Sequence, residues 1–194
     1  MLNFLLYNRF ENVDDLLKQY VKKNDFWLNR SIKIDQALTP KENLKKVLTD
    51  LVEELYENAI MQRILLWALN DTHLVTRFMI LAREVENVQL IRYFDANLGN
   101  YGVHFNATHA MLISGIYYLI LHKSISTFST VDFSTEENKE LMKQNVCDMI
   151  DKLFSEPNDV KTMAKKLLNK GVDKNIIAEV TGLSMEELDR LNVE

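Results

Sequence analysis

The spacing of apolar residues constrains this chain more than any other feature of its sequence. Apolar residues recur at three and four positions rather than at two, as they do along one face of an α-helix. Only five glycines and two prolines interrupt the 194 residues. The sequence therefore predicts an all-α protein. Its apolar share of 47% is enough for one sizeable core, or for a domain with a small appendage.

Capping patterns and apolar stripes place the predicted helices. Thr39 with Glu42, and Ser134 with Glu137, have the spacing of capping boxes. Asn12 is expected to cap the first long helix. The expected helices cover about residues 12–34, 39–56, 59–69, 74–98, 106–121 and 134–154.

The helix expected at 106–121 is apolar on nearly every side, so it must be covered on every side. A second copy of the chain is a natural source of that cover, and the alternative is burial inside a monomer. Together with the helix at 134–154 it would build a two-fold four-helix bundle. The candidate dimer-interface residues are Met111, Ser114, Gly115, Tyr118, Leu141, Val146, Met149 and Leu153.

The segment Leu6–Leu17, with the sequence LYNRFENVDDLL, resembles a connector of the tetracycline-repressor (TetR) family. In that family the connector joins a helix-turn-helix to a helical sensor domain. The order and lengths of the expected helices are also similar to the TetR ligand-binding and dimerisation domain. The resemblance implies that residues 12–155 form such a domain and that residues 1–11 are the remnant of a recognition helix and its connector. Val13 departs from the family, which usually has lysine or arginine there.

A sensor domain of this type implies a pocket for a small apolar ligand between its middle helices. His73 and Arg77 would orient an acidic or hydrogen-bonding group of that ligand. Each candidate is equally explained as an ordinary core or surface residue. The candidate pocket residues are Trp27, Tyr56, Met61, Trp67, His73, Arg77, Phe78, Tyr93 and Phe94.

The composition changes after Phe154, where a short polar segment indicates a linker to a small helical module at residues 156–194. Gly182 suits the turn of a helix-turn-helix, because Ala178 precedes it and Leu188 follows it at positions that lock two helices together. The segment is also similar to the short helical tail of transposase-like recombination-promoting nucleases, of type GxDxxxIAxxTGLSxEEL.

The charge of this module argues against strong DNA binding. Its expected recognition helix carries Glu186, Glu187 and Asp189 against a single arginine. The whole chain has a formal net charge of -5, which gives no general attraction to nucleic acid. A packing or protein-interaction role is therefore the alternative to DNA contact. The candidate DNA contacts are Lys165, Lys174 and Arg190.

Catalytic motifs and metal-ligand spacings are missing from the sequence, so we expect a protein that is not an enzyme, with no catalytic residue, metal or cofactor. The four histidines have no His-Glu-x-x-His spacing, and Cys147 is the only cysteine. His104 and His109 flank an expected helix start, which favours capping or surface roles. The longest apolar stretch, 110–121, is shorter than the ~20 residues that span a bilayer. We expect a cytoplasmic protein with no membrane partner.

Together these observations predict a homodimeric, TetR-like transcriptional regulator that senses a small molecule, with DNA as a candidate partner. The alternative is an interaction protein that does not bind DNA and that heterodimerises with, or titrates, an intact regulator.

Overall fold

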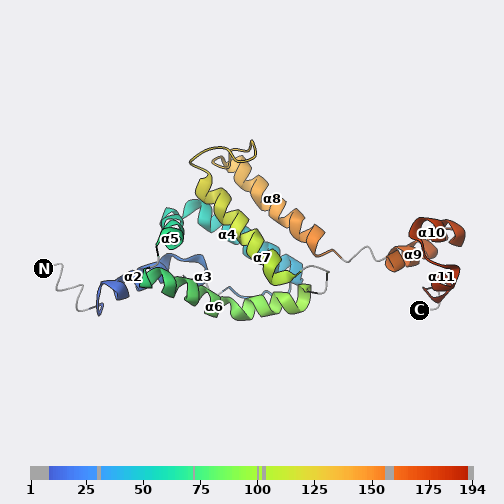
Figure 1. Ribbon diagram of the computed structural model, residues 1–194, viewed down its shortest axis with the longest axis horizontal. Helices are drawn as coiled ribbons and strands as arrows, with labels where there is room; N and C mark the ends of the chain where they lie inside the picture. The colour runs from blue at the N-terminus through green and yellow to red at the C-terminus, as the bar shows by residue number, and fades with distance from the viewer. Residues whose placement is uncertain are drawn as a thin grey trace. The chain divides into compact units, whose positions relative to one another are not determined.

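The computed structural model describes residues 9–29, 32–71, 73–99, 101, 104–155 and 160–191. In this part of the chain all regular structure is helical (Figure 1), which confirms the predicted all-α class. The expected remnant of a recognition helix at residues 1–11 lies mostly outside the described residues. The helices are α2 (Val13–Asn24), α3 (Phe26–Asn29), α4 (Pro40–Glu57), α5 (Ala59–Asn70), α6 (Leu74–Leu98), α7 (Phe105–His122), α8 (Glu136–Leu153), α9 (Val160–Asn169), α10 (Lys174–Thr181) and α11 (Met185–Leu191).

The chain divides into two compact units, Met1–Phe154 and Ser155–Glu194. The larger unit contains α2–α8, and the smaller unit contains α9–α11. Across the described ranges, no helix taken singly has the length and apolar character to cross a bilayer. The bent pair of α5 and α6 reaches that threshold by length and composition only.

The helix predicted at 12–34 is wrong in its second half, because Asp25 interrupts it. Asp25 has extended backbone angles, φ -94° and ψ 128°, so α2 ends at Asn24. Its carboxylate then accepts hydrogen bonds from the backbone N–H groups of Trp27 at 3.0 Å and Leu28 at 3.3 Å. One aspartate thus ends α2 and caps the short α3.

The starts of α4 and α8 show how local signals define helix ends. Thr39 and Glu42 form the predicted capping box, with side-chain to backbone distances of 3.2 and 2.7 Å. The capping box expected from Ser134 and Glu137 does not form, and the cap lies one residue later as a single hydrogen bond from Asn138 N–H to Thr135 Oγ1 at 3.3 Å. Thr135 is the N-cap of α8, whereas Ser134 donates its backbone N–H and its hydroxyl to Asp132. The Ser134 hydroxyl, which was predicted to cap α8, therefore bonds to the carboxylate of Asp132 instead.

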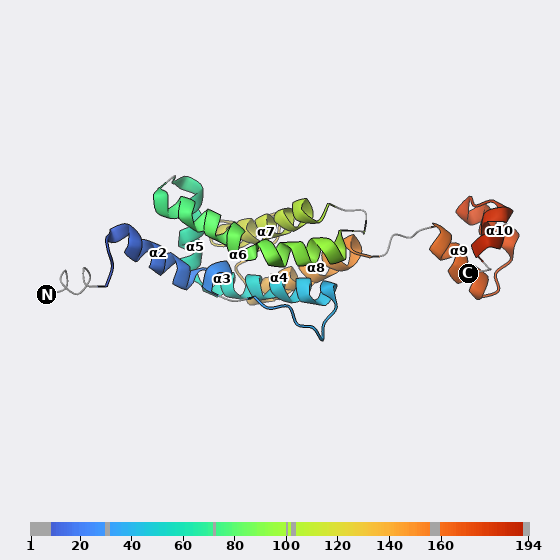
Figure 2. The same ribbon diagram turned by 90° about the horizontal axis from the view of Figure 1, so that it is seen from below.

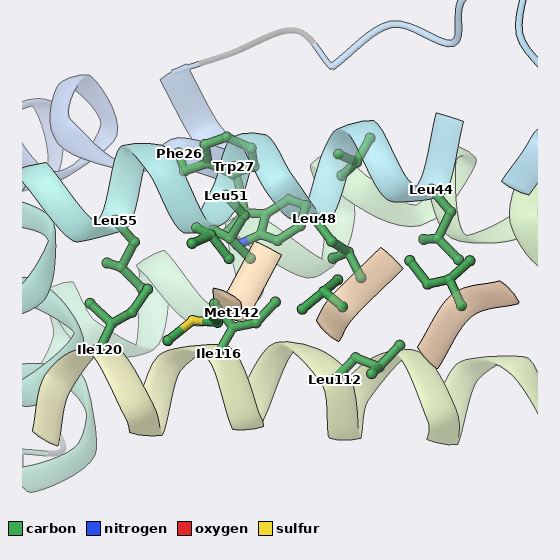
Figure 3. Close-up of a cluster of buried hydrophobic side chains, with 14 of the residues drawn as sticks. Phe26, Trp27, Leu44, Leu48, Leu51, Leu55, Leu112, Ile116, Ile120 and Met142 are labelled. Atoms are coloured by element: carbon green, nitrogen blue, oxygen red, sulfur yellow. The ribbon is translucent and has the colours of Figure 1, made fainter. Parts of the chain in front are cut away.

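The main core lies between α4, α7 and α8 (Figure 3). The buried stripe of α4 has the 4-3-4 spacing of an amphipathic helix, and it faces three buried residues of α7. Met142 of α8 fills the space between them. The residues of this core that Figure 3 labels on α4 and α7 are Leu44, Leu48, Leu51, Leu55, Leu112, Ile116 and Ile120.

Helices α4, α6 and α7 pack against one another in pairs, and α8 packs along α4 (Figure 2). A second apolar cluster lies where α2, α5 and α6 meet, and it buries Val21, Ile64, Val75 and Met79. The larger unit therefore has two apolar centres that share α6 as a common wall.

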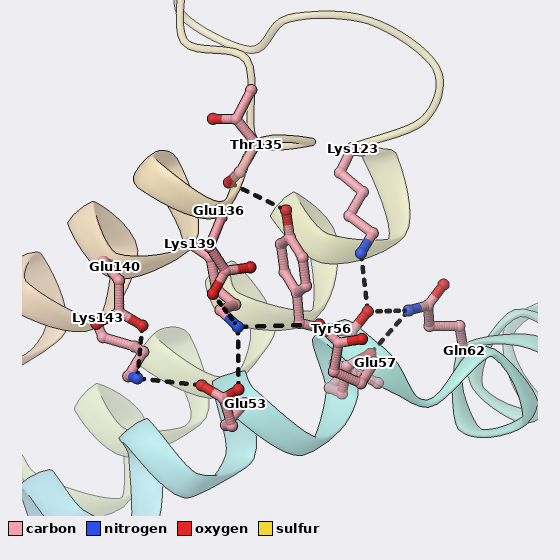
Figure 4. A network of polar contacts seen from close by, with 11 residues as sticks. Glu53, Tyr56, Glu57, Gln62, Lys123, Thr135, Glu136, Lys139, Glu140 and Lys143 are labelled. Carbon is pink, nitrogen blue, oxygen red and sulfur yellow. Dashed lines mark hydrogen bonds and ion pairs between the residues drawn. The ribbon is translucent and has the colours of Figure 1, made fainter.

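A network of polar contacts joins the end of α4 to the start of α8 (Figure 4). The buried Lys139 ammonium lies 2.5 Å from Glu136 Oε1 and 2.9 Å from Glu53 Oε1, and these hydrogen bonds raise the pKa of Lys139. The hydroxyl of Tyr56 donates to the carbonyl oxygen of Thr135 at 3.1 Å. The network fixes the relative register of α4 and α8.

Candidate functional site

An apolar groove lies between α7 and α8, and both helices pack against α4. It has a volume of about 490 Å³, and we call it the α7–α8 groove. Its floor consists of buried core side chains, whereas Met111 on its rim is 75% exposed. The residues that line it are Thr108, Met111, Leu112, Gly115, Ile116, Leu119, Phe133, Met142, Asn145, Val146, Met149 and Leu153.

Gly115 opens the backbone of α7 to this groove. A Cβ atom built at Gly115 would meet no atom within 4 Å, so the missing side chain leaves free space beside the helix. A second helix could therefore approach α7 closely at this point, as small residues allow in helix pairs.

The structure brings five of the eight candidate interface residues together in the α7–α8 groove: Met111, Gly115, Val146, Met149 and Leu153. Val146 is buried in the core, and Leu153 is half-buried. Ser114 and Tyr118 are exposed and line other hollows of the surface, beside α5 and α6. Leu141 is exposed on α8 outside the residues that line the groove.

A second hollow lies between α3, α6 and α7. Its volume is about 450 Å³, which falls in the usual range of small-molecule pockets, and we call it the α6–α7 cavity. Apolar side chains from both helices line it together with polar ones. The lining residues are Trp27, Ile80, Arg83, Glu84, Asn87, Ile91, Asn106, His109, Ala110, Ile113, Ser114 and Tyr117.

Two polar contacts hold the walls of the α6–α7 cavity in place. Arg83 Nε donates to the fully buried Asp25 Oδ2 at 2.8 Å, which joins α6 to the start of α3. Trp27 Nε1 donates to the hydroxyl of Tyr117 at 2.6 Å, which joins α3 to α7. Burial raises the pKa of Tyr117 above its ordinary value.

His109 is buried beside the cavity, which corrects the capping or surface role expected for it. Its ring stacks on Phe105, with 5.4 Å between ring centroids. Its Nε2 atom is buried and has no hydrogen-bond partner among the described residues. Burial lowers the pKa of His109 to about 4, so the ring is neutral at pH 7. His104, in contrast, caps α7 by accepting from the backbone N–H of Ala107 at 3.4 Å.

The nine residues predicted to line a ligand pocket do not converge on this cavity. Trp27 lines it, but Met61 and Phe94 are fully buried in the main core. Arg77 and Phe78 lie on the exposed outer side of α6.

The remaining four predicted pocket residues serve local structure. Tyr56 belongs to the network at the end of α4, and Tyr93 is half-buried against the main core. Trp67 donates its indole N–H to Asp71 at 2.9 Å, and His73 caps α6. The prediction chose large side chains near the middle helices, but side-chain size does not show which of them face a void.

The polar residues of the cavity were missed because each carries a weak local signal. Arg83 and Asp25 are 58 residues apart, so only the folded chain shows that they form a pair. The signal available in the sequence was that Arg83 directly follows the apolar run 79–82 and that His109 directly precedes the apolar run 110–113.

The smaller unit is a bundle of three short helices around Ala164, Ile177 and Leu188, which are fully buried. Gly182 ends α10 with φ +70°, a left-handed conformation that favours glycine, and its N–H donates to Ala178 O at 2.8 Å. A three-residue turn of Gly182, Leu183 and Ser184 then leads into α11. This is the helix–turn–helix geometry expected from the sequence, with α11 in the recognition position.

This geometry agrees with a family model that the C-terminal part of the sequence matches. Residues 161–193 match the C-terminal helix-turn-helix domain of the Rpn/YhgA-like nuclease family. The similarity of the C-terminal tail to that of a nuclease family is thereby confirmed. Comparisons with curated proteins and with solved structures gave no match. The TetR resemblance of residues 12–155 therefore stays a prediction.

Two acidic residues of α11 make contacts within the helix-turn-helix unit itself. Asp189 pairs with Lys174 of α10, with 2.5 Å between Oδ1 and Nζ. Glu187 accepts from the backbone N–H of Ser184 at 2.9 Å, and this capping lowers the pKa of Glu187. Of the three candidate DNA contacts, Lys174 is engaged by Asp189, Lys165 is half-buried and Arg190 is exposed. Six basic and five acidic residues leave the unit, from 160 to 191, nearly neutral.

Within the described residues, no group of three or more histidine, cysteine, aspartate or glutamate side chains is placed to hold a metal ion.

Proposed function

We propose that this chain is a homodimeric regulatory protein in which the α7–α8 groove joins two copies and the helix-turn-helix unit contacts DNA. The groove is the observation that supports this function best. It exposes apolar side chains on both rims and a backbone that Gly115 leaves open. If a second copy places its own α7 and α8 against these helices, the four would form a bundle of the type common in symmetric dimers.

Dimerisation would compensate for the weak charge of the helix-turn-helix unit. A single, nearly neutral unit gives little electrostatic attraction to phosphate. Two units carried by one dimer bind as linked modules, and the second contact then forms at a high effective concentration. The α6–α7 cavity supplies a place for a small, mainly apolar ligand, as a sensor of TetR type would require.

The test combines light-scattering mass with fluorescence anisotropy of a labelled mixed-sequence DNA duplex at two salt concentrations. We expect twice the chain mass and a DNA affinity that falls as salt rises. The logarithm of the DNA affinity falls with the logarithm of the salt concentration. Substituting Lys165 and Arg190 by alanine should make this slope shallower by about one unit for each phosphate that the variant no longer neutralises. Lys46→Ala, in the larger unit, is the matched control and should leave the slope unchanged. A monomer would contradict the proposal, as would a dimer that binds no DNA.

The second candidate is an interaction protein that dimerises without binding DNA. The exposed Glu186 in the first turn of α11 favours it, since an acidic side chain that faces phosphate is repelled. This alternative would be supported by a dimer that leaves the anisotropy of the labelled duplex unchanged when it is added at low salt.

The cavity is tested with the neutral fluorescent probe N-phenyl-1-naphthylamine. The chain has two tryptophans, so Trp67→Phe leaves Trp27 at the cavity wall as the sole indole. In this variant we expect the bound probe to quench the fluorescence of Trp27. In the wild-type chain, binding should raise the emission of the probe, and Ile113→Trp, which fills the cavity, should abolish that rise. Equal probe emission from the filled variant and the wild type would contradict binding at this cavity.

A further inference from the structure

Helix α6 has two apolar faces, and the described residues of the larger unit bury one of them and leave the other largely exposed. Its inner face buries Val75, Met79, Leu90 and Phe94 in the two apolar clusters of the larger unit. An amphipathic surface helix usually places charged residues opposite such a stripe. In α6 the opposite face is apolar as well.

The outer apolar residues of α6 follow a heptad pattern. Their spacing is 4-3-4-3, which is that of the a and d positions in a coiled coil. Their side chains are between 37% and 70% exposed. We call this stripe the α6 seam, and it consists of Leu74, Phe78, Leu81, Val85 and Val88.

Two opposite charges flank the α6 seam on one side. Arg77 and Glu84 are one heptad apart, and each directly precedes a residue of the seam. Both are exposed, and neither forms an ion pair with another side chain in the described part of the chain. They lie at equal distances, about 5 Å along the helix axis, on either side of the midpoint between Ile80 and Leu81.

This symmetry suits a second copy of the same helix in the opposite direction. A two-fold axis through the midpoint would bring Arg77 of each copy opposite Glu84 of the other. The same axis would place Leu81 close to its own copy, Phe78 near Val85 and Leu74 near Val88. In a parallel pair, by contrast, Arg77 of one copy would lie level with Arg77 of the other, and the two ion pairs would not form by symmetry.

We propose that the α6 seam pairs with the α6 seam of a second copy in antiparallel orientation. This contact is separate from the α7–α8 groove and does not rest on it. Two self-complementary contacts in one chain would make the dimer associate further as its concentration rises. The partner is a second copy because the seam supplies both the heptad spacing and the complementary charges that such a pair requires.

The charges give the first test, which is sedimentation equilibrium of the full chain over a range of concentrations. We use the Gly115→Gln background, in which the groove is obstructed, so that association through α6 is measured by itself. Arg77→Glu or Glu84→Arg alone should weaken this association about tenfold, because each replaces two attractions by two repulsions. The double reversal should restore it. Glu86→Lys, an exposed charge change on α6 away from the seam, is the control and should have no effect.

Disulfide cross-linking tests the orientation in a Cys147→Ser background, which removes the only cysteine. In an antiparallel pair, Leu81→Cys should form a covalent dimer under mild oxidation, whereas Leu74→Cys alone should not. A parallel pair would cross-link at both positions and would overturn the stated geometry.

Three results would overturn the proposal as a whole. They are unchanged association in Leu81→Glu, failure of the double charge reversal to restore association, and seam-dependent binding of the chain to phosphatidylcholine vesicles without self-association. Failure of the groove-mediated dimer would leave the α6 result unaffected, because the background already lacks that contact.

Discussion

Asp25 has three structural roles at once. It ends α2, caps α3 and forms a buried ion pair with Arg83 of α6. A buried carboxylate is tolerated only when such partners replace the water that it loses. The sequence could not reveal this residue as an organising point, because an aspartate between Asn24 and Phe26 has no local signal that distinguishes it from a surface residue.

The first prediction at this scale concerns the buried pair. Arg83→Met should lower the free energy of unfolding by about 3–5 kcal/mol, because the carboxylate of Asp25 would stay buried without its cation. Chemical denaturation followed by circular dichroism measures the change. Lys46→Met, which removes a surface ion pair with Asp50, is the control and should change stability little. Similar losses in the two variants would show that Asp25 gains no special stabilisation from Arg83.

The second prediction concerns His109. Its folded pKa of about 4 lies below the ordinary value of 6.5, so the unfolded chain binds the proton more readily between these pH values. Stability should therefore fall as the pH decreases from 6.5 to 4, by at most about 3 kcal/mol from this group. His109→Gln should remove that part of the pH dependence, as measured by urea unfolding at pH 7 and pH 4.5. Asn106→Gln, at an exposed position of α7 with no titratable group, should leave the pH dependence unchanged.

At the scale of single helices, α7 combines burial on α4 with an open backbone at Gly115. Gly115→Gln should stabilise the helix by roughly 0.5–1 kcal/mol, because glycine is a poor helix former and no atom lies within 4 Å of its missing Cβ. The same substitution should weaken the dimer, because the new side chain occupies the α7–α8 groove. Urea unfolding at low concentration measures the gain in stability. Light scattering at high concentration, with both chains carrying Leu81→Glu to prevent pairing through α6, measures the loss of the groove contact.

Asp148→Asn, on the exposed side of α8, is the control for both the higher stability and the weaker dimerisation expected of Gly115→Gln. It should change neither the mass nor the stability appreciably. If Gly115→Gln did not lower the mass of the Leu81→Glu chain, the groove would not be a contact between copies.

Helix prediction succeeded where the signal was local. The capping box at Thr39 and the stripe of α4 needed only residues within a few turns of one another. The break at Asp25 and the shift from Ser134 to Thr135 depended on side chains that the fold brings into competition. The same distinction explains the sites. The residues of the α7–α8 groove follow helical periodicity, whereas the polar wall of the α6–α7 cavity depends on contacts between distant segments.

At the scale of the whole molecule, the two units have separate cores. Ile177→Ala should remove about 2–5 kcal/mol from the smaller unit, which has only a small buried cluster to compensate. Hydrogen exchange measured by mass spectrometry should become faster in peptides of α9–α11 and stay unchanged in those of α4–α8. Val180→Ala, at an exposed position of α10, is the control. Faster exchange throughout the chain would show that the units unfold together.

The position of Glu84 links the α6–α7 cavity to the α6 seam. It lines the α6–α7 cavity, and it is also one of the two charges beside the α6 seam. A molecule that enters the cavity and reorients this carboxylate would change the free energy of pairing between copies. By thermodynamic reciprocity, pairing would change the affinity of the cavity by the same factor. The Glu84 side chain would then couple ligand binding in the cavity to the oligomeric state of the protein.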